Sequence, residues 1–489
     1  MTRARRRLLP LALAVSAPFL SGCLEFSPGK YCAERPQACE LKLSNVEPAI
    51  GFDKGGTQVT LIGRAFEPDT VVTVDGVSAY PAVYDSGRIS LKMPSRAQPG
   101  RATITARHAY GEASLPDAFL YLAYPFQADT PSASVPPGSF SSALAVADMN
   151  GDGKPDVLTA NPSPSTLSVL ISNGNFSFQA ARTFSAGKEQ FRAPSELVPG
   201  DFNNDGKTDV AVAICCGLGG ILLGNGDGTL QPAREFPRTD TVFGPFGMAK
   251  GDFNRDGKLD LASGSDSGVN VLFGKGDGTF QPPVRRIPGS PVRGVHALDM
   301  NGDGFLDIIT TRWVSVDVRS PSNQITVSFG DGEGSFPMTT VINVGGFGVD
   351  RLFPGDIDSD GKLDLITIGF NDLRILLGNG NGTFKEPLLR EISMQPGDLI
   401  ARDFDADGKV DLLLTGYVVS SDGSPFLPTM AILYGSGQSN FISPVTLGIT
   451  SQVRAAMAAD LNQDGKDDVI TIESDSLVKF YPARTPPSP

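Results

Sequence analysis

One acidic pattern, D-x-[N/D]-x-D-G-x-x-D, occurs seven times in this chain of 489 residues. Each copy offers side-chain oxygens at positions 1, 3, 5 and 9, and Gly at position 6 permits a sharp turn. A hard cation such as Ca2+ takes about six to eight oxygen ligands from a flexible loop of this kind. Because clustered carboxylates repel one another without a cation, we expect up to seven structural calcium ions. The alternative is a set of Asp-Gly turns that bind no metal.

The loop resembles the first nine positions of an EF-hand loop. Position 7 contributes its backbone carbonyl, so its side chain is free to vary. Position 12, which is Glu in an EF-hand, falls here in an apolar strand, and the Asp at position 9 replaces it, as in integrin-type loops. The expected metal ligands are Asp148, Asn150, Asp152, Lys154, Asp156, Asp201, Asn203, Asp205, Lys207, Asp209, Asp252, Asn254, Asp256, Lys258, Asp260, Asp299, Asn301, Asp303, Phe305, Asp307, Asp356, Asp358, Asp360, Lys362, Asp364, Asp403, Asp405, Asp407, Lys409, Asp411, Asp460, Asn462, Asp464, Lys466 and Asp468.

The segments around each loop predict four short strands. A strand such as 143–147 leads into the loop, and an apolar run such as 365–368 follows it. Such a run is typical of a strand that is covered on both faces. A third strand ends at a Gly-rich turn such as 272–280, and a fourth strand comes after it. Four antiparallel strands recurring about every fifty residues are typical of a propeller blade.

The repeats at 124–482 resemble the FG-GAP/VCBS repeats of integrin alpha-subunit heads and of many secreted bacterial proteins. This resemblance implies a seven-bladed β-propeller. The seventh unit has room for only three strands, whereas Pro125-Phe126-Gln127 mirrors Thr279-Phe280-Gln281. We therefore expect 124–135 to supply the outer strand of the last blade, which hides a sheet edge. Residues 483–489 are expected to be a flexible tail.

Residues 43–122 alternate apolar and polar positions between turn residues, which predicts a small two-sheet sandwich. Val46-Glu-Pro48, Gly55-Gly56-Thr57, Val74-Asp-Gly76 and Phe119-Leu-Tyr121 resemble the IPT/TIG family of immunoglobulin-like domains. Such domains act as spacers or interaction modules. The predicted fold class is therefore all-β, with a small immunoglobulin-like sandwich followed by a seven-bladed β-propeller.

The N-terminus predicts an exported, lipid-anchored protein. Residues 1–22 combine four arginines with an apolar run too short to span a bilayer, which is typical of a signal peptide. Leu20-Ser21-Gly22-Cys23 resembles the bacterial lipobox, so Cys23 is the expected lipidation site and 23–42 the anchor and linker. The alternative is ordinary secretion with Cys23 left as a thiol or in a disulfide. The expected location is the bacterial envelope, at the outer membrane or the cell surface.

The remaining cysteines fit an oxidising compartment. Cys32 and Cys39 lie in a short loop beside the anchor and are expected to pair. Cys215 and Cys216 are adjacent at the end of an apolar strand, where two buried thiols or a vicinal disulfide are both possible.

Charge and composition exclude several functions. A net charge of −13 and a pI near 4.8 argue against nucleic acid as a partner. Removal of residues 1–22 takes the charge to −17, and seven calcium ions would bring it to −3. With only two histidines, a His-based zinc site or catalytic triad is not expected.

These features favour a non-enzymatic binding or adhesion protein that recognises a glycan or a protein. In the fourth and sixth repeats, 23 and 24 residues separate the ninth-position Asp from the next Gly-rich turn, against 14 in the third and fifth. These insertions lie on the face opposite the Asp loops and suit binding. The candidate ligand-binding residues are Arg312, Trp313, Arg319, Tyr417 and Phe426. The insertions are alternatively tolerated surface loops.

Two other functions stay open. One is a polysaccharide-acting propeller lyase or hydrolase, which would need acid and base groups converging in a cleft. His296 precedes the fourth loop, where a lone His is more often a packed core residue than a base. The other is a purely structural spacer.

Overall fold

The computed structural model describes residues 40–484 except 110, 128–130, 135–142, 163, 188–193, 215–217, 238–242, 290, 316–320, 346–350, 370, 393, 419–426, 438–439, 443, 448, 450 and 474–476. The side chains of 83–84, 218, 243–246, 313–315 and 321–323 also lie outside the description. The described residues form strands and turns without any helix, and accordingly include no helix suited to crossing a membrane.

The chain divides into two compact units. One takes in Gly55–Ser95 and Gly100–Leu120 together with the described residues before Ile50. The other takes in Ile50–Lys54, Arg96–Pro99 and the chain from Tyr121 onward.

The N-terminal strands form two antiparallel sheets with apolar side chains buried between them. Alternation drives this arrangement, since β8 buries every second residue from Ala102 to Ala106. One sheet has the order β1 (Lys42–Glu47), β3 (Gln58–Arg64), β7 (Arg88–Lys92), β6 (Pro81–Asp85). The other has the order β2 (Ile50–Phe52), β9 (Gly111–Leu122), β8 (Gly100–His108), β4 (Val71–Val74), β5 (Val77–Ala79).

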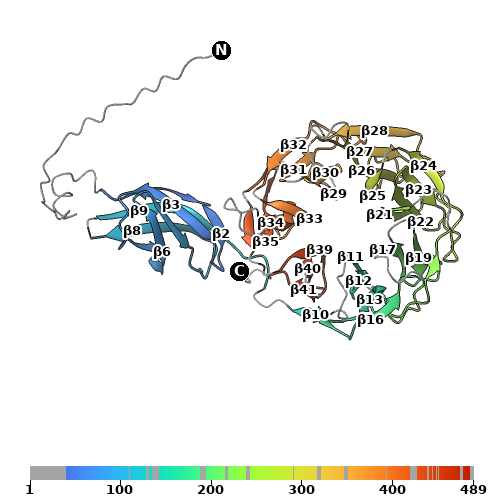
Figure 1. The fold of residues 1–489 in the computed structure, drawn as a ribbon, viewed down its shortest axis with the longest axis horizontal. Coiled ribbons are helices and arrows are strands. Elements are labelled where there is room, and N and C mark those ends of the chain that lie inside the picture. Colours follow the sequence, from blue (N-terminus) through green and yellow to red (C-terminus); the bar gives the residue numbers. More distant parts are fainter. Residues whose placement is uncertain are drawn as a thin grey trace, which may run out of the picture. The chain divides into compact units, whose positions relative to one another are not determined.

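From Ser132 onward, the described strands of the second unit form seven four-stranded antiparallel sheets, one for each Asp loop, and two small hairpins. Figure 1 shows them in a ring with their first strands toward the centre. We number these sheets as blades one to seven in the order of their Asp loops. The all-β prediction, a small sandwich followed by a β-propeller, is confirmed.

The four strand positions of blades one to seven are occupied as follows. The first strands are β11 (Ala143–Ala147), β17 (Pro194–Gly200), β21 (Phe243–Gly251), β25 (Val292–Leu298), β29 (Arg351–Gly355), β33 (Gln395–Arg402) and β39 (Val453–Ala459). The second strands are β12 (Asp156–Pro162), β18 (Asp209–Ile214), β22 (Asp260–Ser265), β26 (Asp307–Ser315), β30 (Asp364–Ile368), β34 (Asp411–Val418) and β40 (Asp468–Glu473).

The third strands are β13 (Ser165–Leu170), β19 (Leu218–Leu222), β23 (Gly268–Leu272), β27 (Pro321–Phe329), β31 (Asp372–Leu376), β35 (Leu427–Leu433) and β41 (Leu477–Tyr481). The fourth strands are β16 (Arg182–Ser185), β20 (Arg234–Glu235), β24 (Val284–Pro288), β28 (Met338–Asn343), β32 (Leu388–Glu391), β38 (Val445–Leu447) and β10 (Ser132–Ser134). Two small hairpins, β14 (Ser172–Gly174) with β15 (Ser177–Phe178) and β36 (Gly435–Gly437) with β37 (Asn440–Phe441), follow third strands.

The ring closes through its own N-terminal segment. Strand β10 pairs antiparallel with β41, with Ser132 opposite Lys479. Phe126 forms an isolated bridge with Ala483, and the backbone N–H of Gln127 donates to Pro482. The predicted contribution of 124–135 to the last blade is confirmed.

The core lies between neighbouring blades. The second strands are buried along almost their whole length, as in β22, β30 and β40. One cluster joins Leu158 of blade one to Val210 and Val212 of blade two. Each second strand is therefore covered on both faces, which explains why its sequence is a continuous apolar run.

Candidate functional site

The Asp at position 9 of each loop begins the second strand of its blade and is fully or almost fully buried. Its Oδ2 accepts the backbone N–H of position 2 at 2.8–3.0 Å in all seven loops. Its Oδ1 accepts a backbone N–H from the segment after the third strand at 2.7–2.9 Å. This carboxylate therefore ties the Asp loop to that segment.

The first positions of each loop organise its backbone. In the loop of blade five, Asp356 accepts the N–H groups of Asp360 and Gly361, and Asp358 also accepts the N–H of Asp360. The Gly at position 6 has φ between 79° and 85° in every copy. Position 4 is left-handed as well, even where it is not glycine, as at Arg255 and Ala406. Two left-handed residues turn the loop back on itself.

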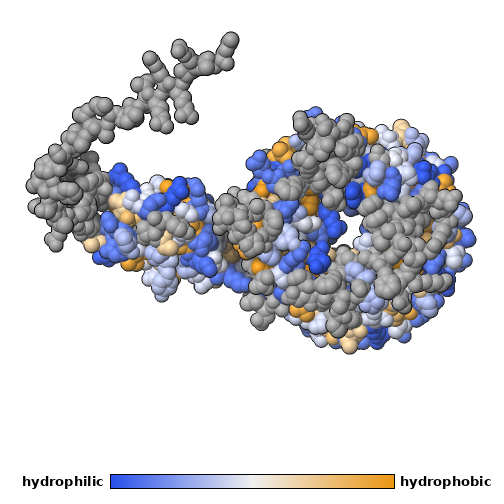
Figure 2. Space-filling model, in the orientation of Figure 1, coloured by the Kyte–Doolittle hydropathy of each residue, from blue (hydrophilic) through white to orange (hydrophobic). Residues whose placement is uncertain are grey.

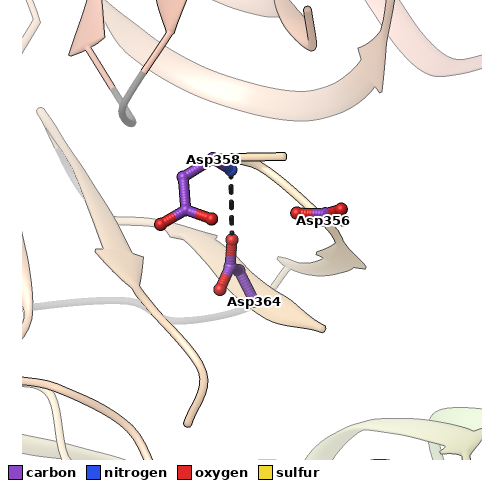
Figure 3. Close-up of side chains that lie close together, drawn as sticks. All are labelled: Asp356, Asp358 and Asp364. Carbon is purple, nitrogen blue, oxygen red and sulfur yellow. Dashed lines mark hydrogen bonds between the residues drawn. The ribbon is translucent and has the colours of Figure 1, made fainter. Parts of the chain in front are cut away.

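Carboxylates converge in two loops of the described chain. Oxygens of Asp356, Asp358 and Asp364 lie within 4.8 Å of one another, as do those of Asp403, Asp405 and Asp411. Figure 3 shows the first group, with the carboxylates of Asp358 and Asp364 close together and the Asp358 N–H donating to Asp364. Carboxylate and carbonyl oxygens suit calcium, so this donor set fits that ion. When bound, the ion would supply positive charge that joins the loop's oxygens.

Position 5 interacts differently. Its carboxylate pairs with the lysine at position 7 in four loops, for example Asp360 with Lys362 at 2.8 Å. These lysines are half-exposed, so each pair contributes little to stability.

Burial raises the pKa of the position-9 carboxyls. The pKa rises to about 7 for Asp260 and Asp411, and to about 6 for Asp307 and Asp468. The two backbone hydrogen bonds oppose the rise, and the neighbouring loop aspartates add to it. A cation among these groups would favour their ionised form.

A second polar constellation lines a cavity of about 570 Å3 that is bounded by the first strands of all seven blades. Figure 2 shows the ring open at its centre. Glu196, Arg293, His296, Arg351 and Asp398 line this cavity, which we call the central cavity. His296 is half-buried at the cavity wall rather than enclosed in a blade core.

Arg351 interacts electrostatically with three other titratable groups of the cavity, Glu196, His296 and Asp398. Its Nε lies 3.7 Å from Asp398 Oδ1. Burial raises the pKa of Glu196 to about 7, while a backbone hydrogen bond from Met248 and the charge of Arg351 oppose the rise. Burial and, to a lesser extent, Arg351 lower the pKa of His296 to about 4, so its imidazole is neutral at pH 7.

Three of the predicted ligand-binding residues lie on described strands of two separate hairpins: Arg312 and Trp313 on β26, and Tyr417 on β34. The insertion of blade four extends β26 and β27, which pair as far as Ser315 and Pro321. That of blade six extends β34 and β35 as far as Val418 and Leu427. Arg312 is half-buried, and burial lowers its pKa, whereas Tyr417 is half-buried on β34. Trp313 lies on β26, but its side chain, Arg319 and Phe426 are outside the described residues.

Other predicted sites also lie outside the described residues. These are Cys23, Cys32, Cys39, Cys215 and Cys216. Their lipidation and pairing stay predictions.

A family model of the FG-GAP-like repeat matches residues 148–212, 201–263, 252–310, 356–414 and 403–471, which together span more than half of the chain. The chain therefore belongs to the family of FG-GAP-like repeat proteins. An IPT/TIG domain model matches residues 41–121. Both resemblances predicted from the sequence are confirmed.

The chain is also similar to individual proteins. Cartilage acidic protein 1 of Xenopus tropicalis is 28% identical over 193 residues, which is 37% of this chain and 29% of that protein. The match thus spans less than a third of that relative. An Agrocybe aegerita lectin recognising non-reducing terminal N-acetylglucosamine has 18% identity and a TM-score of 0.45, covering 82% of this chain and 94% of its own. A Burkholderia pseudomallei lectin has 15% identity and a TM-score of 0.47, covering 84% and 99%.

The sequence reasoning missed the grouping of Glu196, Arg351 and Asp398. One signal was present, because each of them stands five residues before the first Asp of its loop. The same position in the other four repeats is Ala143, Gly247, Gly294 and Ala455. Aligning the repeats on the loops would have shown three charged residues among four small ones.

Proposed function

We propose that this protein is a calcium-stabilised, envelope-anchored binding or adhesion protein whose propeller recognises a glycan or a protein. The observation that carries the proposal is the convergence of three carboxylates within 4.8 Å in the loops of blades five and six. Carboxylates this close repel one another, and a divalent cation offsets the repulsion. Because each loop is tied through position 9 to the turn after the third strand, calcium would rigidify one whole face of the ring.

The recognition surface in this proposal is formed by the hairpins β26–β27 and β34–β35. Strands β26 and β27 have nine residues each, whereas β30 and β31 have five each. The Asp loop precedes each second strand, so these hairpins end on the opposite side of the blade. Projecting segments on a rigid scaffold are favourable places for binding, and Trp, Tyr and Arg are favourable residues.

The experiment is a glycan and protein array probed with the mature chain, with and without a calcium chelator. Trp313→Ala and deletion of 419–426 are expected to weaken binding to any ligand found, while the melting temperature in calcium stays unchanged. The matched control is Asp266→Ala in the short β22–β23 turn of blade three. Full binding by both hairpin variants would place the site elsewhere.

A polysaccharide-acting enzyme is the second candidate. The observation that favours it is the presence of Glu196, His296 and Asp398 in one cavity. Release of soluble products from a polysaccharide panel, abolished by Glu196→Gln, would establish it over the binding proposal.

A further inference from the structure

Equivalent positions of the seven repeats line the central cavity. All seven residues located five positions before a loop line this cavity. Four are small, namely Ala143, Gly247, Gly294 and Ala455, and leave room at the centre of the ring. The other three are charged, and they come from blades two, five and six. The cavity is thus an open space with charge concentrated on part of its wall.

The carboxylate of Asp398 is held in place by backbone. Its Oδ1 accepts the N–H of Leu399 at 3.0 Å, and its Oδ2 accepts the N–H of Ala456, on the neighbouring blade, at 3.1 Å. Its side chain is only 10% exposed. The carboxylate of Asp398 is therefore held in a fixed position, and Arg351 Nε lies 3.7 Å from its Oδ1.

Arg351 has donors to spare. Its side chain is 52% exposed, and its ion pair with Asp398 uses Nε. Among the described residues, no hydrogen bond is formed by its two terminal nitrogens. A guanidinium presents such nitrogens as a planar fork that matches the two oxygens of a carboxylate.

The neighbouring groups limit the charge of a ligand. Arg351 and Arg293 are positive, His296 is neutral, and Glu196 changes between neutral and negative near pH 7. Burial raises the pKa of Asp398, whereas Arg351 and two backbone N–H groups favour its carboxylate form, which is the form counted here. The wall therefore carries between zero and one positive charge, which suits a monoanion better than a dianion. A cationic ligand would be repelled by the positively charged guanidinium of Arg351. The volume, about 570 Å3, lies within the range of small-molecule sites.

We propose that the central cavity binds a small organic monocarboxylate, whose carboxylate pairs with the guanidinium of Arg351. Neutral His296 and protonated Glu196 can each donate a further hydrogen bond to the ligand. Leu144, Val295 and Met457 supply apolar wall for its carbon skeleton. The site is independent of the Asp loops and of the two long hairpins.

The test is calorimetric titration of the full mature chain in calcium at low salt. The probes are acetate, pyruvate and D-glucuronate, with D-glucose and inorganic sulfate as neutral and dianionic counterparts. We expect at least one monocarboxylate to bind one-to-one and more tightly than glucose or sulfate. Absence of binding by all three, or equal binding of sulfate, would overturn the proposal.

Substitutions of Arg351 test whether this residue binds the carboxylate. Arg351→Gln is expected to weaken the bound carboxylate at least tenfold, and Arg351→Lys to weaken it less. The matched control is Arg285→Gln on the outer strand β24, which should leave the affinity unchanged. If Arg351→Gln does not fold, Arg351→Lys carries the test, because it keeps the charge and removes the fork. Unchanged affinity in the folded Arg351 variants would contradict the assignment.

The pH dependence provides a second readout. A bound anion favours protonated Glu196, so the affinity of wild type should fall several-fold between pH 6 and pH 8. The other titratable groups that line the cavity with Glu196 are Arg351, Arg293, His296 and Asp398, and burial raises the pKa of Asp398 as well. Glu196→Gln should remove the fall. A Glu196→Gln variant that keeps the wild-type slope would show that another group controls binding.

Discussion

The buried carboxylate of Asp411 accepts a hydrogen bond from the backbone N–H of Gly435, 24 residues further along the chain, at 2.8 Å. Its second oxygen accepts the N–H of Phe404 at 2.8 Å. The ninth position of the loop therefore has a structural task of its own, whatever ion the loop binds. It connects the Asp loop with the turn beyond the third strand, and the same pair of hydrogen bonds recurs in every blade.

We therefore expect the Asp at position 9 and the Asp at position 5 of the loop to contribute to stability in different ways. Asp411→Ala leaves two backbone N–H groups without their acceptor, and we expect it to cost about 2–4 kcal/mol with or without calcium. Asp407→Ala should lower the melting temperature only in calcium. Thermal denaturation in calcium and in chelator measures both. Equal responses of the two variants in chelator would contradict the distinction.

Chelation should lower the melting temperature of the wild-type propeller, because each loop then keeps its carboxylates without a cation. Asp256→Ala should reduce the bound calcium by one ion per chain, measured by elemental analysis of folded protein. Asp266→Ala, an acidic residue outside the loops, is the control. If the folded protein contains no calcium and its melting temperature does not change on addition of chelator, the metal assignment is wrong.

Backbone conformation should decide the effect of two loop substitutions. Ala406 has φ of 62°, so Ala406→Gly should stabilise the propeller by about 0.5–1 kcal/mol. Gly257 has φ of 79° and nothing within 4 Å of an added Cβ, yet Gly257→Ala should destabilise it by about 1–2 kcal/mol. Urea unfolding measures both changes. A neutral Gly257→Ala would show that the loop tolerates L-residues there without strain.

Glu196 should make stability depend on pH. Its folded pKa, about 7, lies above the ordinary value of 4.5, so its contribution is complete below pH 4.5 and is lost as pH rises through 7. Glu196→Gln should therefore be on the order of 2 kcal/mol more stable than wild type at pH 8 and equal to it at pH 4. His296 acts in the opposite sense, losing stability as pH falls from 6.5 toward 4. Unfolding at both pH values decides the matter.

The anchor prediction concerns Cys23. Cys23→Ser should abolish labelling by a fatty-acid probe and release the protein into the soluble fraction. Cys39→Ser is the control, because it changes a cysteine outside the lipobox. A Cys23→Ser protein that is still labelled and still sediments with membranes would refute lipidation at this residue.

Local chemistry made the repeats predictable from the sequence. The spacing of acids and glycines within nine residues is a local requirement of the turn, and the apolar run after Asp364 follows from its burial on both faces. The outer strand of the last blade was predictable too, because Phe126-Gln127 repeats a motif found beside Phe280. The left-handed backbone conformation at Arg255 and Ala406 could not be predicted, because Arg and Ala do not favour it. The hydrogen bonds within the loop hold the backbone in that conformation.

Only the tertiary structure decided the central cavity. Glu196 and Arg351 stand three blades apart in the sequence order, and no local pattern connects them. Closing the ring brings every first strand to one axis, so equivalent positions of distant repeats line the same space. Burial there, rather than residue type, raises the pKa of Glu196 and lowers that of His296. The sequence determined the blades and their loops, whereas ring closure decided which charges share an environment.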